Sequence, residues 1–204
     1  MRKQLALTLL LSAACASSAL AAEAKPVYKW VSANEYYFIL PTPQVLAISG
    51  AGTESVKPWG FGFRAVGSET FSRTGGLQFQ SIKVDSPATG RDTVYLWDLL
   101  LGVEYLAPKV QAKPLRFTAA AFADLGLSDT TFFAAPVISA GLLYTTDESA
   151  GTPTGLTFDI FYRLTDIDLD NAGGGRAGTL RPALGFKIGY IFEGFWTTKE
   201  KTAD

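Results

Sequence analysis

Two carboxylates, Asp98 and Glu104, lie six residues apart in YLWDLLLGVEY, the otherwise apolar stretch of residues 95–105. Two carboxyl groups on one face of a strand could do general acid–base chemistry. A structural role is favoured, because an equal number of cations accompanies the acids in similar segments. The ten charged residues are Arg64, Arg116, Arg163, Arg181 and Lys187, with Asp98, Glu104, Asp124, Asp159 and Glu193. Opposite charges lower the cost of burying one another, so we expect these ten residues to form ion pairs in a common interior.

Other catalytic groups are scarce. The chain has no histidine, and its one cysteine is Cys15 in the N-terminal segment. Histidine is the most common proton carrier in hydrolases and acyl transferases. We therefore expect no catalytic residue and no enzymatic activity.

A metal site has one weak candidate. Asp166, Asp168 and Asp170 alternate in DIDLDNAGGG, as the first ligands of an EF-hand calcium loop do. Asn171 stands where that loop requires glycine, and Ala177 stands where it requires glutamate. The favoured interpretation is a solvated acidic loop, and no cofactor is expected.

The alternation of apolar and polar residues predicts that the charged residues lie on β-strands. Residues 95–105 place aromatic and aliphatic side chains on one face and both acids on the other, as a half-buried strand does. The same period recurs in six further segments between residues 59 and 192, separated by turn-rich pieces. An eighth strand must come from residues 28–50, where EYYFIL and VLAIS both qualify, and Pro41 and Pro43 prevent one uninterrupted strand.

The character of the polar face distinguishes between two kinds of barrel. A soluble, lipocalin-like barrel turns its apolar face inward and covers its outer face with charge, whereas a transmembrane barrel turns its apolar face toward lipid. The polar face here carries mostly Gly, Ala, Thr and a balanced set of charges. We therefore predict an all-β fold, an eight-stranded antiparallel up-and-down transmembrane β-barrel, with a soluble ligand-binding barrel and a sandwich as alternatives.

The N-terminus predicts export. Residues 1–21 have two cations, an apolar run and a small-residue ending, the layout of a secretory signal peptide, and a lipoprotein cleavage before Cys15 is the alternative. We expect the barrel domain over residues 22–196 and a polar tail over residues 197–204. The formal net charge of −1 argues against nucleic-acid binding.

The last predicted strand carries a recognisable motif. In KIGYIF, residues 187–192, the residues Lys187, Gly189, Tyr190 and Phe192 match the assembly signal of bacterial outer-membrane barrels. The chain resembles the small eight-stranded barrels of the OmpA-like, OmpX-like and opacity-protein group, although twelve residues follow Phe192 where the signal usually ends the chain. The resemblance implies Sec-type export to a Gram-negative outer membrane, with membrane lipid and the barrel assembly machinery as partners. The enzymes of this fold rely on a histidine that this chain lacks.

The expected function is a non-enzymatic barrel with a closed, charge-paired lumen, structural in the cell envelope or a platform for an envelope protein partner. The alternative is a narrow conduit or binding barrel for a small apolar ligand, in the outer membrane or soluble in the periplasm. It is motivated by five apolar residues on the same face as the charges, namely Leu96, Leu100, Phe122, Phe161 and Ile191.

Overall fold

The structure is a computed structural model that describes residues 28–85, 92–108, 114–128, 131–147, 154–169, 178–194 and 198–201. The predicted signal peptide, residues 1–21, lies outside this part of the chain. All regular elements among the described residues are strands. No helix within the same ranges is long and apolar enough to cross a bilayer.

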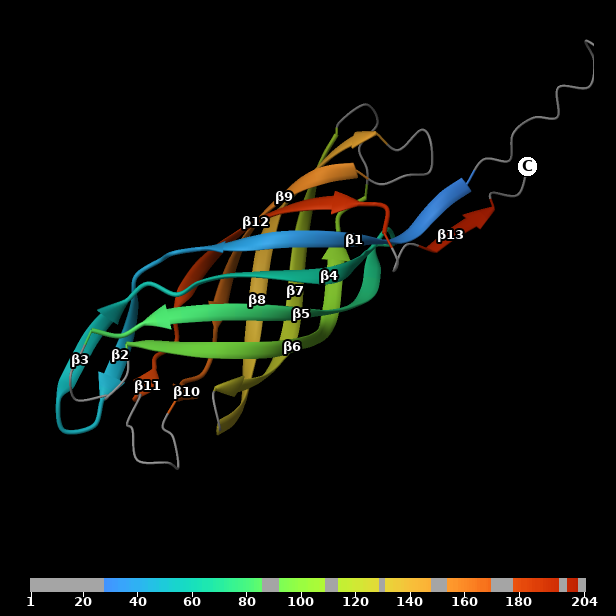
Figure 1. Cartoon of the computed structure of the whole chain (residues 1–204). Coiled ribbons are helices and arrows are strands. Elements are labelled where there is room, and N and C mark those ends of the chain that lie inside the picture. The colour runs from blue at the N-terminus through green and yellow to red at the C-terminus, as the bar shows by residue number, and fades with distance from the viewer. Residues whose placement is uncertain are drawn as a thin grey trace, which may run out of the picture.

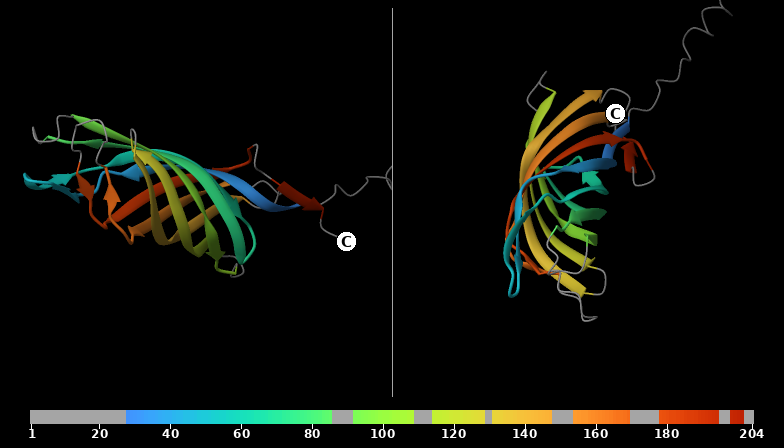
Figure 2. Two further views of the ribbon diagram at one scale, coloured as in Figure 1. Left: turned by 90° about the horizontal axis from the view of Figure 1, so that it is seen from below. Right: turned by 60° about the vertical axis from the view of Figure 1, so that its left-hand side comes forward.

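Eight of the strands form a closed antiparallel barrel (Figure 1). They are β1 (Tyr28–Leu40), β4 (Trp59–Gly67), β5 (Phe71–Lys83), β6 (Thr93–Leu106), β7 (Leu115–Ser128), β8 (Thr131–Asp147), β9 (Thr154–Arg163) and β12 (Leu184–Phe192). Each pairs with the next along the chain, and β12 pairs with β1 from Asn34↔Phe192 to Leu40↔Phe186. The strands tilt around a common axis (Figure 2). The predicted eight-stranded, up-and-down antiparallel barrel is confirmed.

The first strand is the earlier of the two candidate segments. β1 contains EYYFIL, whereas most of VLAIS lies in β2 (Gln44–Ile48). Pro41 and Pro43 lie between them, where a missing N–H group interrupts the pairing of a strand. The start of β1 also pairs with β13 (Thr198–Lys201), so the predicted polar tail contains a short strand.

A second, smaller sheet lies at one end of the barrel (Figure 1). Its order is β10-β11-β2-β3, with β3 (Gly52–Val56), β10 (Ile167–Asp168) and β11 (Thr179–Leu180). β2 and β3 belong to the β1–β4 connection, and β10 and β11 belong to the β9–β12 connection. Because β11 pairs with β2, the two connections form one layer, which we call the cap.

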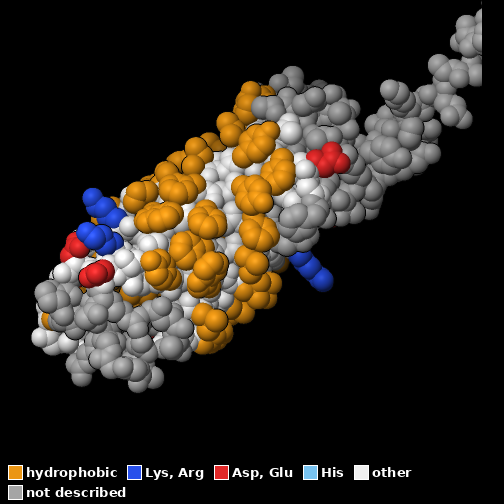
Figure 3. Space-filling view, viewed as in Figure 1, with side chains coloured by type: hydrophobic (Ala, Val, Ile, Leu, Met, Phe, Trp, Pro, Cys, Tyr) orange, Lys and Arg blue, Asp and Glu red, His pale blue; other side chains and the backbone are white. Residues whose placement is uncertain are grey.

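The barrel wall presents apolar side chains outward and polar side chains inward. In β6 the accessible fraction is 61% for Trp97 and 41% for Leu99, but 2% for both Asp98 and Glu104. Alternate positions of β9 show the same pattern. Figure 3 shows hydrophobic side chains over the barrel surface and charged side chains near its rims.

Candidate functional site: the barrel interior

The centre of the interior is an ion-pair cluster around Arg64 of β4. The guanidinium of Arg64 contacts Glu35 through Nε, and its Nη2 lies 3.4 Å from Glu104 Oε1 and 3.2 Å from Asp159 Oδ2. All four side chains are at most 5% accessible. One cation thus serves three carboxylates that come from β1, β6 and β9. We call these four residues the Arg64 cluster.

Strand register brings the Arg64 cluster together. Glu35 and Arg64 are direct cross-strand partners in the β1–β4 pair. Two hydroxyls from other strands support the carboxylates: Thr157 donates a hydrogen bond to Glu35, and Thr118 donates one of 3.3 Å to Asp159. Charge-assisted hydrogen bonds of this kind offset the cost of burying the acids.

A second polar group lies nearer the cap. Asp98 Oδ2 accepts hydrogen bonds of 2.8 Å from the amides of both Gln78 and Gln80. The Tyr37 hydroxyl donates to Gln78 at 3.2 Å. The Lys187 ammonium lies over the rings of Tyr37 and Phe161, with distances of 4.6 and 4.9 Å to the centroids. These aromatic faces attract a buried cation where water cannot solvate it.

Little open space remains between these groups. A cavity of about 10 Å³ is lined by Gln78, Gln80, Leu100, Phe122, Asp124, Val137, Phe161, Arg163 and Lys187. That volume is about the space of one water molecule. Arg163 lies in the part of the interior nearest the cap. Its Nη2 donates hydrogen bonds to Gln44 Oε1 at 3.2 Å and to the Arg181 carbonyl at 2.6 Å.

Seven of the ten predicted lumen charges lie in the interior. They are Arg64, Asp98, Glu104, Asp124, Asp159, Arg163 and Lys187, all at most 8% accessible. Arg116 is half-buried, and its Nε donates to the Ala107 carbonyl at 2.8 Å. Arg181 and Glu193 are exposed, and Arg181 pairs with Asp166 on the surface. These three residues lie near the ends of strands or beyond them, where a long side chain reaches the rim rather than the interior.

Glu35 is a charged interior residue that the sequence interpretation missed. It is fully buried and contacts Arg64, yet it lies in the segment whose strand assignment stayed open. The signal was the alternation in EYYFIL, which places Glu35, Tyr37 and Ile39 on one face. With Glu35 included, the described interior holds five carboxylates and three cations. The predicted equal number of five cations and five carboxylates is therefore not found in the described interior.

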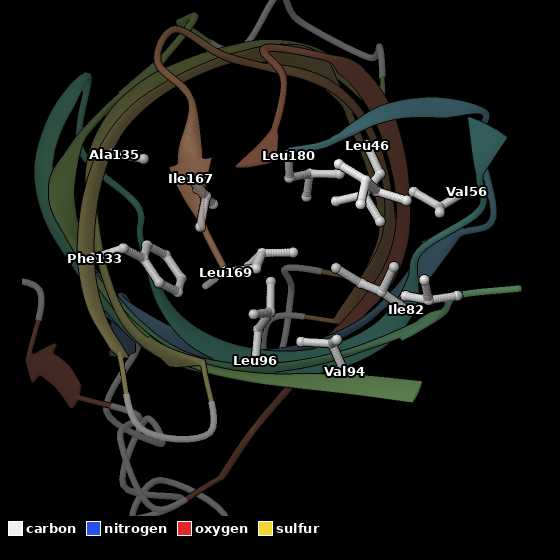
Figure 4. Packing of buried hydrophobic residues seen from close by; sticks show 12 residues of the cluster. Leu46, Val56, Ile82, Val94, Leu96, Phe133, Ala135, Ile167, Leu169 and Leu180 are labelled. Atoms are coloured by element: carbon white, nitrogen blue, oxygen red, sulfur yellow. The ribbon is translucent and has the colours of Figure 1, made fainter. Parts of the chain in front are cut away.

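Apolar clusters lie on both sides of the charged region. At the capped end, Leu46, Ile48, Val56, Ile167, Leu169 and Leu180 of the cap region pack against Ile82, Val84, Val94, Leu96, Phe133 and Ala135 of the wall. Figure 4 shows Ile167 and Leu169 within the ring of barrel strands, with wall side chains pointing toward them. At the other end Ala33, Val66, Leu106, Leu143 and Ile191 form a second cluster.

The apolar residues that motivated a ligand pocket are divided among these clusters. Leu96 belongs to the capped end, Ile191 belongs to the opposite end, and the remaining three lie between them. The five residues therefore do not belong to one apolar cluster.

The calcium candidate is only partly described. Asp166 and Asp168 are exposed, Asp166 pairs with Arg181, and Asp170 lies outside the described residues. Within the described ranges no three potential metal ligands are grouped closely enough to hold an ion.

The residues of the predicted assembly signal lie on β12 beside the closing pair. Lys187 is buried, Gly189 pairs with Tyr37, and Tyr190 points outward with 48% of its surface accessible. The ring of Phe192 stacks against Tyr36 of β1 at a centroid distance of 5.1 Å. Recognition of this strand by an assembly machinery stays a prediction.

Comparison with known proteins finds similarity of structure alone. No protein-family model and no curated protein sequence matches the chain. The crystal structure of the outer membrane protein OprG from Pseudomonas aeruginosa is similar, with 11% identity, a TM-score of 0.44, and coverage of 83% of this chain and 98% of OprG. The solid-state NMR structure of the outer membrane protein AlkL in DMPC lipid bilayers is similar too, with 12% identity, a TM-score of 0.42, and coverage of 89% and 96%.

Proposed function

We propose that the protein is a non-enzymatic barrel of a bacterial outer membrane whose closed interior gives it a structural or platform role in the envelope. The observation that carries this proposal is the occupied interior. The Arg64 cluster fills the centre, and apolar side chains fill both ends. A barrel of eight strands is just wide enough for side chains to fill.

The outer surface supports a membrane location. Apolar side chains project from the strands of the wall, and many keep about half of their surface accessible, such as Phe61, Leu101 and Leu156. Transfer of such surface out of water stabilises a protein by about 25 cal/mol per Å². Tyrosine and tryptophan lie near both ends of the strands, with Trp59, Tyr95 and Tyr162 toward the cap and Tyr105, Tyr144 and Tyr190 toward the opposite end. Two such aromatic belts are typical of membrane barrels.

The membrane location is tested by cell fractionation followed by gel electrophoresis with and without boiling. We expect the protein in the outer-membrane fraction, with a mobility that changes on heating because the closed barrel resists detergent. Release of the protein from washed cells without detergent would contradict the location and would favour the soluble periplasmic alternative.

The closed lumen is tested separately with the purified protein in planar bilayers. We expect no large, steady conductance, because the cavity lined by Gln78, Asp124, Arg163 and Lys187 in the charged region has a volume of only about 10 Å³. Steady conductance of a size that requires a water-filled pore would contradict the closed interior while leaving the membrane location intact.

A second candidate, a conduit for a small apolar molecule, is favoured by the apolar lining of the capped end. Twelve buried apolar residues meet there, and the cap is joined within its own sheet by only a two-residue pairing between β11 and β2. Such a conduit requires the cap to move, since the described interior is filled. Entry of an apolar fluorescent probe into protein-containing vesicles faster than into protein-free vesicles would support it, and equal rates would contradict it.

A further inference from the structure

We propose that the outer wall over β4, β5 and β6 binds one acyl chain of a phosphate-bearing lipid in a groove of the barrel surface. This inference rests on the proposed membrane location, and it adds a ligand site on the opposite face of the wall from the interior. The inference is based on two adjoining hollows in that wall, on the basic residues at its rim, and on the chemistry of the surrounding lipid.

Strand register builds the first hollow. One row of outward side chains crosses the wall through the pairs Phe61↔Phe79 and Phe79↔Trp97, whose ring centroids lie 5.3 and 4.7 Å apart. The next row toward the uncapped end contains Leu77 and its partner Leu99. Between the two rows the side chains of Gln78 and Asp98 point inward, and the positions of Gly62 and Gly126 also face the interior. The backbone therefore forms the floor of a hollow of about 450 Å³.

The second hollow adjoins the first and is floored by small residues. Ala65, Gly75 and Gly76 line it together with Leu77, Leu99 and Leu101, and its volume is about 510 Å³. Leu77 and Leu99 line both hollows, so the two form one continuous groove. Each volume lies within the range of roughly 300–1,000 Å³ that small-molecule sites occupy.

The opposite wall differs in a way that makes the groove local. Outward positions of β9 and β12 carry large side chains throughout, namely Leu156, Phe158, Ile160, Tyr162, Leu184, Ile188 and Tyr190. Figure 3 shows the wall over β4, β5 and β6 from outside, with strips of backbone between its hydrophobic side chains. The outward residues Ala65 and Gly75 of β4 and β5 are small, and none of the outward residues of β9 and β12 named above is.

An acyl chain fits the recess better than another protein does. The groove lies within the apolar band of the wall, so its occupant must be apolar along its length. A second barrel is convex and rigid, and its side chains would rest on the flanking rows without reaching the floor. A flexible hydrocarbon chain can follow the floor and contact rigid aromatic rings on one side and leucines on the other.

Two lysines lie at the rim above the groove. Lys57 precedes β4 by two residues and Lys83 ends β5, and the pair Trp59↔Ser81 places both at the same rim. The Lys83 ammonium lies 3.2 Å from Asp85, but both side chains are more than 70% exposed, so this ion pair holds weakly against a competing anion. Glu54 also lies at the rim, where it accepts a hydrogen bond from the Asp85 backbone. A lipid phosphate between the two lysines would gain two charge-assisted contacts.

Trp97 lies in the groove and provides the reporter for the test. A variant that keeps this tryptophan alone, with Trp30, Trp59 and Trp196 replaced by phenylalanine, is reconstituted in phosphatidylcholine vesicles. A minor fraction of brominated phosphatidylglycerol or brominated phosphatidylcholine is added, because bromine quenches tryptophan on contact. The matched control is a variant without native tryptophan that carries Ile160→Trp on the opposite wall.

We expect the quenching of Trp97 by brominated phosphatidylglycerol to correspond to a local lipid fraction about fivefold above the bulk fraction. Quenching of the control tryptophan should correspond to the bulk fraction itself. Gly75→Leu should remove the enrichment, since a side chain added at Gly75 lies beside the Leu101 side chain and fills the recess, with its Cβ in a tight contact of 3.3 Å with the Leu100 carbonyl oxygen. Ala65→Leu serves the same purpose if the first variant loses its folded gel mobility. Lys57→Gln with Lys83→Gln should abolish the preference for phosphatidylglycerol.

Quenching of Trp97 in proportion to bulk composition would overturn the proposed site, and so would equal enrichment of both lipids. Loss of all quenching at Trp97, together with cross-linked dimers, would overturn it in favour of a second copy of the chain. Absence of quenching at both reporters would instead show that the protein is not in the bilayer, which is a failure of the proposed location and not of the groove.

Discussion

At the scale of single residues, the interior depends on one guanidinium. Arg64 contacts Glu35, Glu104 and Asp159, and the three carboxylates have no other cation within ion-pair distance among the described residues. Removal of one member of a buried ion pair leaves an uncompensated charge, which costs far more than the pair contributes. Arg64 and its partners should therefore respond very differently to substitution.

Arg64→Gln is expected to lower the free energy of unfolding by about 3–5 kcal/mol, because it leaves three buried acids without their cation. Urea unfolding in lipid vesicles, followed by tryptophan fluorescence, measures the change. Arg181→Gln is the matched control, since its ion pair with Asp166 is exposed and should contribute less than about 1 kcal/mol. Equal effects of the two variants would contradict the central role of Arg64.

Glu104→Gln is expected to leave the free energy of unfolding unchanged within about 0.5 kcal/mol, or to raise it. The amide keeps the shape of the side chain, and it removes one of three acids that share a single cation. Glu104 Oε2 makes no hydrogen bond with any described residue, so little is lost there. The same unfolding experiment applies, and a loss comparable to that of Arg64→Gln would argue that all three carboxylates are needed.

At the scale of elements, the cap and the wall are stabilised by different interactions. The wall is a continuous ring of paired strands, whereas the cap contacts it through the apolar cluster and the hydrogen bonds of Arg163 to Gln44 and the Arg181 carbonyl. Two neighbouring residues of β2 allow the contribution of the apolar cluster to be tested. Leu46 is fully buried in the cluster, whereas Val45 is 47% exposed. The cap should therefore loosen before the barrel does.

Leu46→Ala is expected to cost about 2–5 kcal/mol of local stability, because it opens a cavity under the cap. The expected result is faster limited proteolysis within residues 41–58 while the heat-dependent gel mobility of the barrel is kept. Val45→Ala should leave the cleavage rate almost unchanged. Loss of the folded mobility in Leu46→Ala would show that cap and barrel unfold as one unit.

At the scale of the whole molecule, the closure of the ring is independent of the C-terminal strand. β12 pairs with β1 over seven residue pairs, and β13 pairs only with the part of β1 that extends past this seam. Closure gives each of the eight described wall strands two neighbours, and this is the arrangement that a bilayer requires of strands.

Deletion of residues 197–204 is therefore expected to leave the barrel folded, with the heat-dependent shift in gel mobility unchanged. The full-length chain, handled in parallel, is the control. Disappearance of the folded species in the truncated protein would show that β13 contributes to closure or to assembly, contrary to the pairing that the structure shows.

The alternation of residue types along the chain was enough to predict the strands and the direction that their faces point. A strand places successive side chains on opposite faces, so the alternation in residues 95–105 already separated the leucines from Asp98 and Glu104. Seven of the predicted lumen charges lie inside for the same reason. Arg116, Arg181 and Glu193 do not, because alternation says nothing about how far along the barrel axis a residue lies.

Which charges meet, and which side chains fill the barrel ends, could not be predicted without the folded barrel. Ion-pair partners such as Arg64 and Asp159 are 95 residues apart, and their contact depends on strand order, register and closure together. The cap could not be predicted either, since β2 and β11 are short segments with no long alternation. They pair because the barrel brings two distant connections to the same rim. Periodicity is local along the chain, whereas these contacts arise from the closed ring.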